Sequence, residues 1–220
     1  MSTKEPISRV KIFKSAVIYS VYLLIVWGFY RNLIKLPDEI EEYIVKPIIW
    51  LVPLVYFVKQ EKGPLSSLGI TVKNLFPAVY FSLGLGLLFL GEAVLVNYTK
   101  YKGFNFSANI GTSPLLPSLV LSFATAISEE VAFRGYIFSR VWKALRNEYI
   151  ANLSTSVVWV IIHIPITVFI WKLDLPASIG YLLLTFLFGL GSAFVFARTG
   201  NILSSILLHV LWEWPIILFR

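Results

Sequence analysis

Residues 115–140 read LLPSLVLSFATAISEEVAFRGYIFSR, and this stretch decides the fold. An apolar run with the character of a membrane span leads directly into two adjacent carboxylates, Glu129 and Glu130. Charge is costly to bury at such depth, so an ionisable group in a membrane helix normally faces a protein interior or a water-filled cavity. The stretch therefore predicts a membrane helix that carries a functional site.

The spacing of the charged residues predicts which carboxylate is neutralised. Glu130 and Arg134 are four residues apart and share one face of a helix, which permits an ion pair. Glu129 is turned by about 100° from Glu130 and is expected to stay free. One glutamate is then structural, and the other is available for chemistry.

Composition places the whole chain in a membrane. Of its 220 residues, 57% are hydrophobic and 14% are charged, and the mean hydropathy is +0.77. A soluble domain of this length cannot bury so much apolar surface in one core. The net charge of +7 does not indicate nucleic acid, because Lys and Arg gather at the ends of the apolar runs. The absence of cysteine excludes disulfide and thiolate chemistry.

Apolar runs divide the chain into seven predicted membrane spans. Neither a second domain nor an internal repeat is visible, so residues 1–220 are expected to form one all-α bundle of seven to eight transmembrane helices. The runs cover residues 15–30, 43–58, 75–98, 115–140, 150–171, 177–197 and 202–219.

Basic residues predict the orientation of this multi-pass membrane protein. With Arg134 assigned to the site, eleven Lys and Arg fall on the N-terminal side of the bundle and seven on the opposite side. Because cytoplasmic loops carry the excess of Lys and Arg, the N-terminus is expected in the cytoplasm. The first apolar run begins like a signal peptide, but no small-x-small cleavage site follows Tyr30, so this span is expected to remain uncleaved.

The chain has two histidines, His163 and His209, and each lies in the middle of an apolar span. A single histidine in such a span is usually a hydrogen-bonded packing residue. Helical rise, however, places Glu129 ~16 Å from Arg140 and His209 ~12 Å from Asn201. We therefore expect the glutamate and both histidines to converge in a polar cavity open to the cytoplasmic half of the membrane.

A carboxylate and two imidazoles around one water are sufficient for hydrolysis. In a low-dielectric cavity a glutamate binds protons more readily than in water, which makes it a usable general base. One histidine can orient the same water, and the other can donate a hydrogen bond to the oxyanion that develops on a peptide carbonyl. Ser205 is a less favoured nucleophile, because serine in such helices commonly packs and bonds the backbone.

Several motifs in the second half of the chain resemble those of one family. Residues 115–214, the expected catalytic core, are similar to the CAAX protease and bacteriocin-processing (CPBP, or Abi) family of intramembrane proteases, of the CAAX prenyl endopeptidase type. The motifs are EEVAFRG (129–135), WVIIH (159–163), FGLG (188–191), RTGNIL (198–203) and His209 in the last span.

The resemblance implies peptide-bond hydrolysis within the membrane, near its cytoplasmic face, by a bundle of about eight helices. The substrate would be a membrane-associated peptide or protein, with or without a prenyl group, and no cofactor is implied. Glu129 and His163 would activate the water, and His209 would help to form the oxyanion site. Glu130 and Arg134 would hold the first motif in shape.

Two positions depart from the family pattern. The position four residues after His209 is usually asparagine, and here it is Glu213. An ionised carboxylate cannot donate a hydrogen bond to an oxyanion. We expect Glu213 to orient His209 by accepting its N–H, while a protonated Glu213 or a weakened oxyanion site are the alternatives. Trp159 replaces the usual phenylalanine and is expected to keep an aromatic wall.

Three other functions remain open from the sequence. Two histidines with glutamates are also able to bind zinc, which gives a metal-dependent version of the protease. A membrane immunity or scaffold protein, binding a bacteriocin, an exporter or a sensor, would use the polar cluster only for packing. A proton-coupled transporter is less favoured, because its inverted repeats would put polar residues in both halves of the chain. The sequence indicates neither the substrate nor the oligomeric state.

Overall fold

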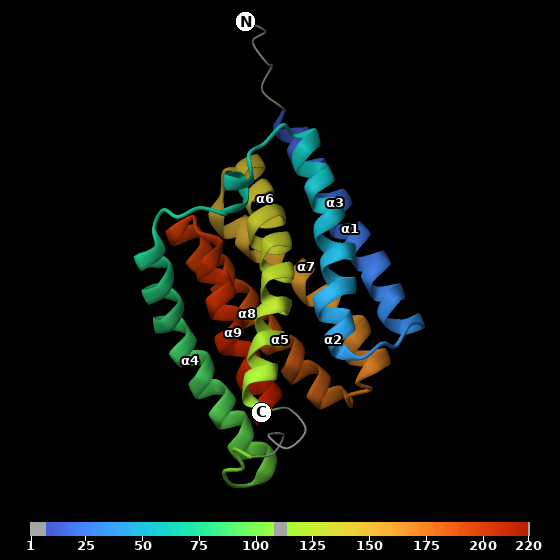
Figure 1. Ribbon diagram of the computed structural model, residues 1–220, viewed down its shortest axis with the longest axis vertical. Helices are drawn as coiled ribbons and strands as arrows, with labels where there is room; N and C mark the ends of the chain where they lie inside the picture. Colours follow the sequence, from blue (N-terminus) through green and yellow to red (C-terminus); the bar gives the residue numbers. More distant parts are fainter. Residues whose placement is uncertain (1–7, 108–113, 220) are drawn as a thin grey trace, which may run out of the picture.

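The computed structural model describes residues 8–107 and 114–219, and within these ranges the chain is helical with no strand (Figure 1). The predicted all-α fold is therefore confirmed. The α-helices are α1 (Arg9–Leu33), α2 (Asp38–Ile40), α3 (Lys46–Gln60), α4 (Leu75–Tyr101), α5 (Leu115–Glu130), α6 (Ser139–Leu145), α7 (Glu148–Pro165), α8 (Leu175–Thr199) and α9 (Ile202–Leu218).

Five helical stretches of the described chain are long and apolar enough to cross a membrane. They are α1, α4, residues 115–145, residues 148–170 and α8. Two further helices, α3 with 15 residues and α9 with 17, are shorter. An integral membrane bundle is thus confirmed, whereas the count of seven to eight spans depends on whether α3 and α9 cross and stays a prediction.

The starts of four helices follow from local capping chemistry. The side chains of Ser8, Asn147, Asp174 and Asn201 each accept a hydrogen bond from a backbone N–H in the first turn of α1, α7, α8 and α9, respectively. Gly200, with φ of +62°, ends α8 in the left-handed conformation that glycine adopts at no steric cost. The tight turn between α8 and α9 is therefore fixed by the sequence.

Three segments of the described part of the chain are π-helical. They are η1 (Glu41–Val45), η3 (Val131–Phe138) and η4 (Ile166–Ile170). A π-helix is rare and occurs frequently at functional sites. Each segment here adjoins an ionisable residue inside the bundle: η1 precedes Lys46, η3 follows Glu130, and η4 begins three residues after His163.

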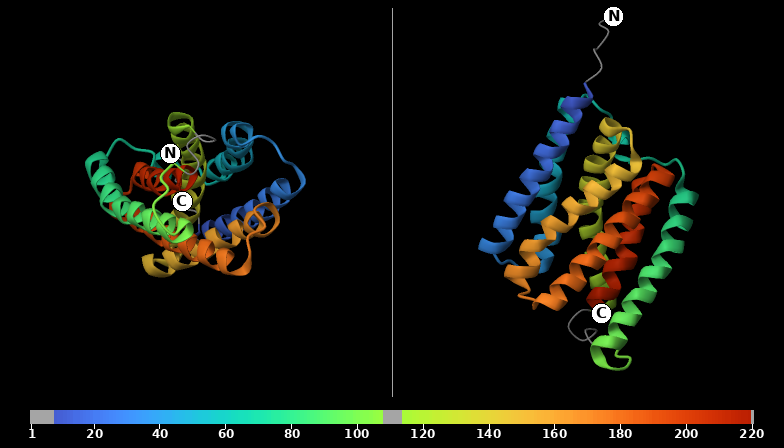
Figure 2. Two further views of the ribbon diagram at one scale, coloured as in Figure 1. Left: turned by 90° about the horizontal axis from the view of Figure 1, so that it is seen from below. Right: turned by 180° about the vertical axis from the view of Figure 1, so that it is seen from behind.

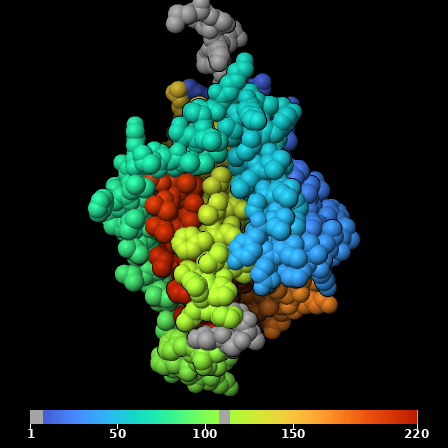
Figure 3. All heavy atoms as spheres, viewed as in Figure 1, coloured from blue at the N-terminus to red at the C-terminus, as the bar shows by residue number. Residues whose placement is uncertain are grey.

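The helix α5 with its continuation η3 is central in the bundle. Figure 3 shows α4, α9, α5 and α3 side by side across one face, and the view from behind in Figure 2 shows α1, α7 and α8 on the other. The eight residues of η3 are all buried. Large apolar side chains on the outer helices, such as Phe29, Leu88 and Ile179, are exposed, as expected where a bundle faces lipid tails.

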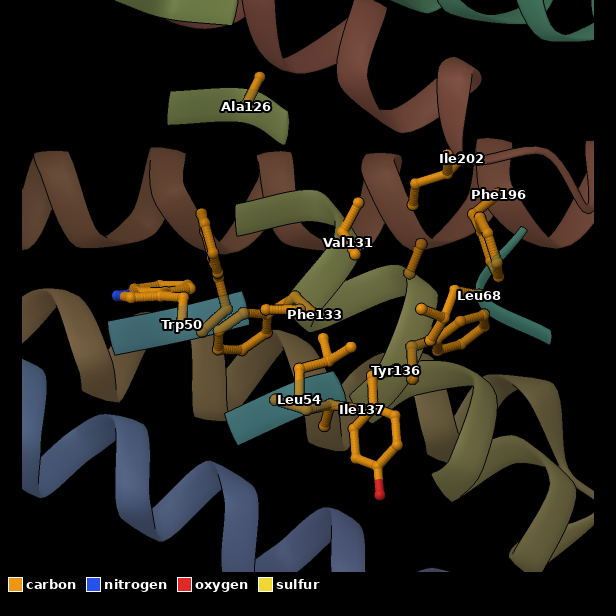
Figure 4. Close-up of a cluster of buried hydrophobic side chains, with 14 of the residues drawn as sticks. Trp50, Leu54, Leu68, Ala126, Val131, Phe133, Tyr136, Ile137, Phe196 and Ile202 are labelled. Atoms are coloured by element: carbon orange, nitrogen blue, oxygen red, sulfur yellow. The ribbon is translucent and has the colours of Figure 1, made fainter. Parts of the chain in front are cut away.

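The aromatic core packs around η3 (Figure 4). The ring of Phe133 lies 6.0 Å from Trp50 of α3 and 4.6 Å from Trp159 of α7. Gly135 is required by close packing, because a Cβ there would lie 2.8 Å from the carbonyl oxygen of Leu68. This core reaches the second half of α1, where the ring of Trp27 lies 5.8 Å from that of Trp50.

The small-residue seam predicted on α8 is used for internal packing. A Cβ on Gly189 would lie 3.1 Å from Ser156 of α7, and one on Gly191 would lie 2.9 Å from Leu85 of α4. The seam therefore lets α8 approach two neighbouring helices closely.

Candidate active site

Three helices bring the predicted site residues to one cavity of about 260 Å³. Glu129 comes from α5, His163 from α7, and both His209 and Glu213 come from α9. The convergence expected from helical rise is therefore found. The catalytic roles of these residues stay a prediction.

The ion pair expected within the first motif is confirmed. Arg134 donates to Glu130 Oε1 at 3.0 Å, and both side chains are buried. The second oxygen, Oε2, accepts from Ser192 Oγ at 2.7 Å, and Arg134 also donates to the Gly189 carbonyl oxygen. The guanidinium lies 4.6 Å from the ring centroid of Trp159. Buried charges of this kind persist only when they are paired and hydrogen-bonded, as they are here.

His209 is oriented by Glu130 and not by Glu213, which corrects the expectation. Nδ1 of His209 lies 2.7 Å from Glu130 Oε1. Since a carboxylate only accepts, Nδ1 carries the proton of this bond. Nε2 then points toward Glu129, whose Oε2 lies 3.9 Å away. Glu213 Oε2 is buried without a hydrogen-bond partner among the described residues. The reason is tertiary: Glu130 faces the imidazole from the neighbouring helix.

Glu129 is not free, which is a second correction. Lys46 donates to Glu129 Oε1 at 2.8 Å, and the same ammonium forms an ion pair with Glu42. Thr125 Oγ1 in turn donates to Glu42 Oε2 at 2.7 Å. Lys46 and Glu42 are site residues that sequence reasoning missed. They lie about 80 residues before Glu129, in a span whose proline content hid its start.

His163 has a defined tautomer. Its Nδ1 lies 2.7 Å from the carbonyl oxygen of Trp159, so Nδ1 donates and Nε2 is left as an acceptor. The ring centroid of Trp159 lies 4.5 Å from that of His163 and 6.0 Å from that of His209. The aromatic wall expected at Trp159 is therefore present. Ser205, which donates to the Ser192 carbonyl oxygen, behaves as a packing serine.

The cavity lies toward the end of the bundle opposite the start of α1. Its lining includes Arg31, in the last turn of α1, and Asp38, at the start of α2. Figure 1 shows α2 at the end of the bundle away from the start of α1. The basic residues Lys143 and Arg198 belong to the other end. A cytoplasmic N-terminus and a cavity open to the cytoplasmic side are therefore incompatible in this fold. Both expectations therefore stay predictions, of which the fold allows one.

The potential metal ligands of the cavity are engaged in other contacts. Across residues 8–107 and 114–219, no group of three or more His, Asp or Glu side chains is arranged to hold a metal ion. One oxygen of Glu129 receives the Lys46 ammonium, and Nδ1 of each histidine is engaged in a hydrogen bond.

Comparison with known proteins finds a family match for the second half of the chain. Residues 111–215 match the family model described as type II CAAX prenyl endopeptidase Rce1-like. No curated protein and no solved structure matches the chain. The matched segment contains Glu129, His163 and His209, whereas Glu42 and Lys46 lie outside it. Over residues 111–215, the chain is therefore similar to the Rce1-like type II CAAX prenyl endopeptidase family, and this match supports its assignment to the CAAX proteases.

Proposed function

We propose that this protein is an intramembrane endopeptidase that hydrolyses a peptide bond of a membrane-associated peptide or protein. The family is one of proteases, and five helices of the described chain are apolar enough to span a membrane. The observation that carries the proposal is the approach of Glu129 Oε2 to His209 Nε2, 3.9 Å apart, in a cavity that His163 also lines.

In the first step, a water in the cavity attacks the carbonyl carbon of the substrate. Glu129 takes one proton of this water as the new C–O bond forms, and His163 Nε2 accepts a hydrogen bond from the other. The electrons of the C=O bond move to the carbonyl oxygen, which becomes an oxyanion.

His209 stabilises this oxyanion through an N–H at Nε2. Because Nδ1–H is already donated to Glu130, the donating form is the imidazolium, and the carboxylate of Glu130 favours that charge. Glu129 then gives its proton to the leaving nitrogen as the C–N bond breaks. The products are a free carboxylic acid, which then loses its remaining proton to water, and a free amine, and Glu129 is ionised again.

Glu213 takes no direct part in the oxyanion site of this scheme. It lies one turn after His209 on α9, and its Oε2 is buried without a hydrogen-bond partner among the described residues. The oxyanion site then depends on His209, without the amide donor that the family pattern has.

The test is hydrolysis by the full chain in proteoliposomes, with prenylated and unprenylated peptides as parallel substrates. Glu129→Gln is expected to abolish cleavage, because the amide cannot take a proton from water. Ser205→Ala is the matched control and is expected to cleave normally. Proteomics of cells expressing Glu129→Ala would identify the natural substrates as peptides that accumulate relative to the unmodified protein. Full activity of Glu129→Gln would overturn the proposal.

A zinc-dependent version of the enzyme makes a different prediction. It requires that removal of tightly bound metal with a chelator abolish cleavage and that zinc restore it. Activity that survives metal removal would mean that the side chains of the cavity catalyse the reaction without zinc.

Glu213 favours a second function, because it replaces the amide expected at the oxyanion site. In this case the protein would be a non-catalytic immunity or scaffold protein, which binds a bacteriocin or another membrane partner. Folded Glu129→Gln and His163→Ala variants that still protect cells or bind the partner would support it.

The basic residues favour a cytoplasmic N-terminus, and we retain this orientation as part of the proposal. The cavity then opens toward the opposite, extracytoplasmic side.

A further inference from the structure

We infer that Lys46, held by Glu42, is a positioning residue that keeps Glu129 ionised and directed into the cavity. This inference rests on the proposed function, since it requires Glu129 to be the general base. Glu42 and Lys46 both lie outside residues 111–215, the segment that the family model matches.

The placement of Lys46 is unlike that of a lysine at a membrane interface. A lysine near the end of a membrane helix normally extends its ammonium to water. Lys46 is 3% exposed, and its Nζ lies 5.2 Å from the ring centroid of Trp27 and 5.9 Å from that of Trp50. Aromatic faces stabilise a desolvated cation. The ammonium is thus held inside the protein.

A closed chain of contacts fixes the ammonium relative to α5. Thr125 of α5 donates to Glu42, Glu42 pairs with Lys46, and Lys46 donates to Glu129, which is one turn after Thr125 on the same helix. The π-helical η1 carries Glu42 and is followed directly by Lys46. Because the chain begins and ends on α5, the carboxylate of Glu129 has little freedom to turn away from the cavity.

Electrostatics give this arrangement a function. Glu130 is paired with Arg134, and Arg31 is paired with Glu41. Within the described chain, Lys46 is therefore the cation that balances the negative charges of Glu42 and Glu129. Adjacent carboxylates without a cation retain a proton on one of them, and a protonated Glu129 cannot act as a base. The ionisable groups that line the cavity with Glu129 are Arg31, Asp38, Glu42, Lys46, His163, Tyr181, His209 and Glu213.

The ammonium also suits the reaction itself. When Glu129 takes a proton, its negative charge is replaced by that of the oxyanion nearby. The total charge near Lys46 is then unchanged between the bound substrate and the intermediate, so the buried cation is compensated throughout.

The experiment measures kcat and KM against pH for the full chain in proteoliposomes. Lys46→Met removes the charge at similar length and is expected to lower kcat about a hundredfold at pH 7 with little change in KM. The acid limb of its profile is expected to move to higher pH by about one unit or more, so that activity partly returns in alkali. Lys46→Arg, which keeps the charge, is expected to retain the acid limb of the unmodified protein.

Glu42→Gln supplies a readout with the opposite sign. Removing this carboxylate leaves Lys46 to Glu129 alone, so the acid limb is expected to move to lower pH. If Lys46 only held α3 against α5, these substitutions would change the amount of folded protein and leave the acid limb of the pH profile where it is in the unmodified protein. Glu42→Gln also keeps the test available if Lys46→Met does not fold.

The outcomes separate this inference from the proposed function. If Glu129→Gln remains active, the proposed function itself fails. If Glu129→Gln is inactive while folded Lys46→Met and Glu42→Gln keep the unmodified acid limb, only the role of Lys46 is overturned.

Discussion

Nδ1 of His209 lies 2.7 Å from Oε1 of Glu130, and this hydrogen bond joins the last helix to the first motif. The same oxygen accepts from Arg134, so one carboxylate serves a cation and an imidazole together. Glu130 is therefore more than the structural partner of an arginine. It sets the proton of His209 on Nδ1 and leaves Nε2 for the cavity.

Glu130→Gln is expected to destabilise the protein by about 3–5 kcal/mol, because the buried Arg134 would lose its counter-charge. Thermal unfolding in detergent checks this. The matched control is Glu148→Gln, which breaks the partly exposed pair with Arg198 and is expected to cost less than about 1 kcal/mol. Equal losses in the two variants would contradict the assignment of a buried network at Glu130.

His209→Asn is expected to lower kcat by about 10²–10³ with a smaller effect on KM, because it removes a charged donor to the oxyanion. Steady-state cleavage of one peptide by the purified variant measures both constants. A rise in KM at constant kcat would place His209 in substrate binding instead.

Glu213→Asn restores the amide that the family pattern has after His209. Since the amide N–H can donate to the oxyanion, kcat is expected to rise by up to about tenfold, whereas Glu213→Ala is expected to give no such gain. The ratio of the two variants in a single cleavage assay is the measurement. A loss of activity in Glu213→Asn would mean that the carboxylate itself is needed.

Gly135→Ala is expected to destabilise the fold by about 1–3 kcal/mol, since the added Cβ would lie 2.8 Å from the Leu68 carbonyl oxygen. Gly84→Ala in α4 is the control: nothing lies within 4 Å of its added Cβ, and helix propensity predicts a gain of about 0.5–1 kcal/mol. Unfolding midpoints of the two variants should therefore shift in opposite directions.

The absence of cysteine makes topology directly measurable. A single cysteine at Asp38, on the cavity side, and one at Lys62, beyond α3, are expected to react with a membrane-impermeant thiol reagent from opposite sides. The basic residues predict that position 62 reacts only after the cytoplasmic side is exposed. Labelling of both positions from the same side would contradict the arrangement of α1 to α3.

Local patterns were sufficient for much of the fold. Each apolar run became helical, and capping side chains mark the starts of α1, α7, α8 and α9. The Glu130–Arg134 pair followed from a spacing of four residues on one helix. Helical rise also placed Glu129 and His209 at a common depth. These predictions succeeded because each depends on one helix at a time.

The partners of the site residues depend on how helices pack, and there the sequence was insufficient. Lys46 reaches Glu129 across 83 positions of chain, and the sign of its charge gave no indication of a site. His209 has a carboxylate at i+4 on its own helix, but the partner comes from α5. A polar residue at the uncertain start of a short span was the one available signal for Lys46.

The π-helical segment η3 changes which residues of the stretch from Ser128 to Arg140 share a helix face. A π turn holds one more residue than an α turn, which shifts the angular position of every later residue by ~100°. A helical wheel drawn evenly from Ser128 to Arg140 therefore assigns its second half to the wrong sides. Substitutions chosen from such a wheel to alter lipid contact would instead fall in protein, because Val131 to Phe138 are enclosed on every side.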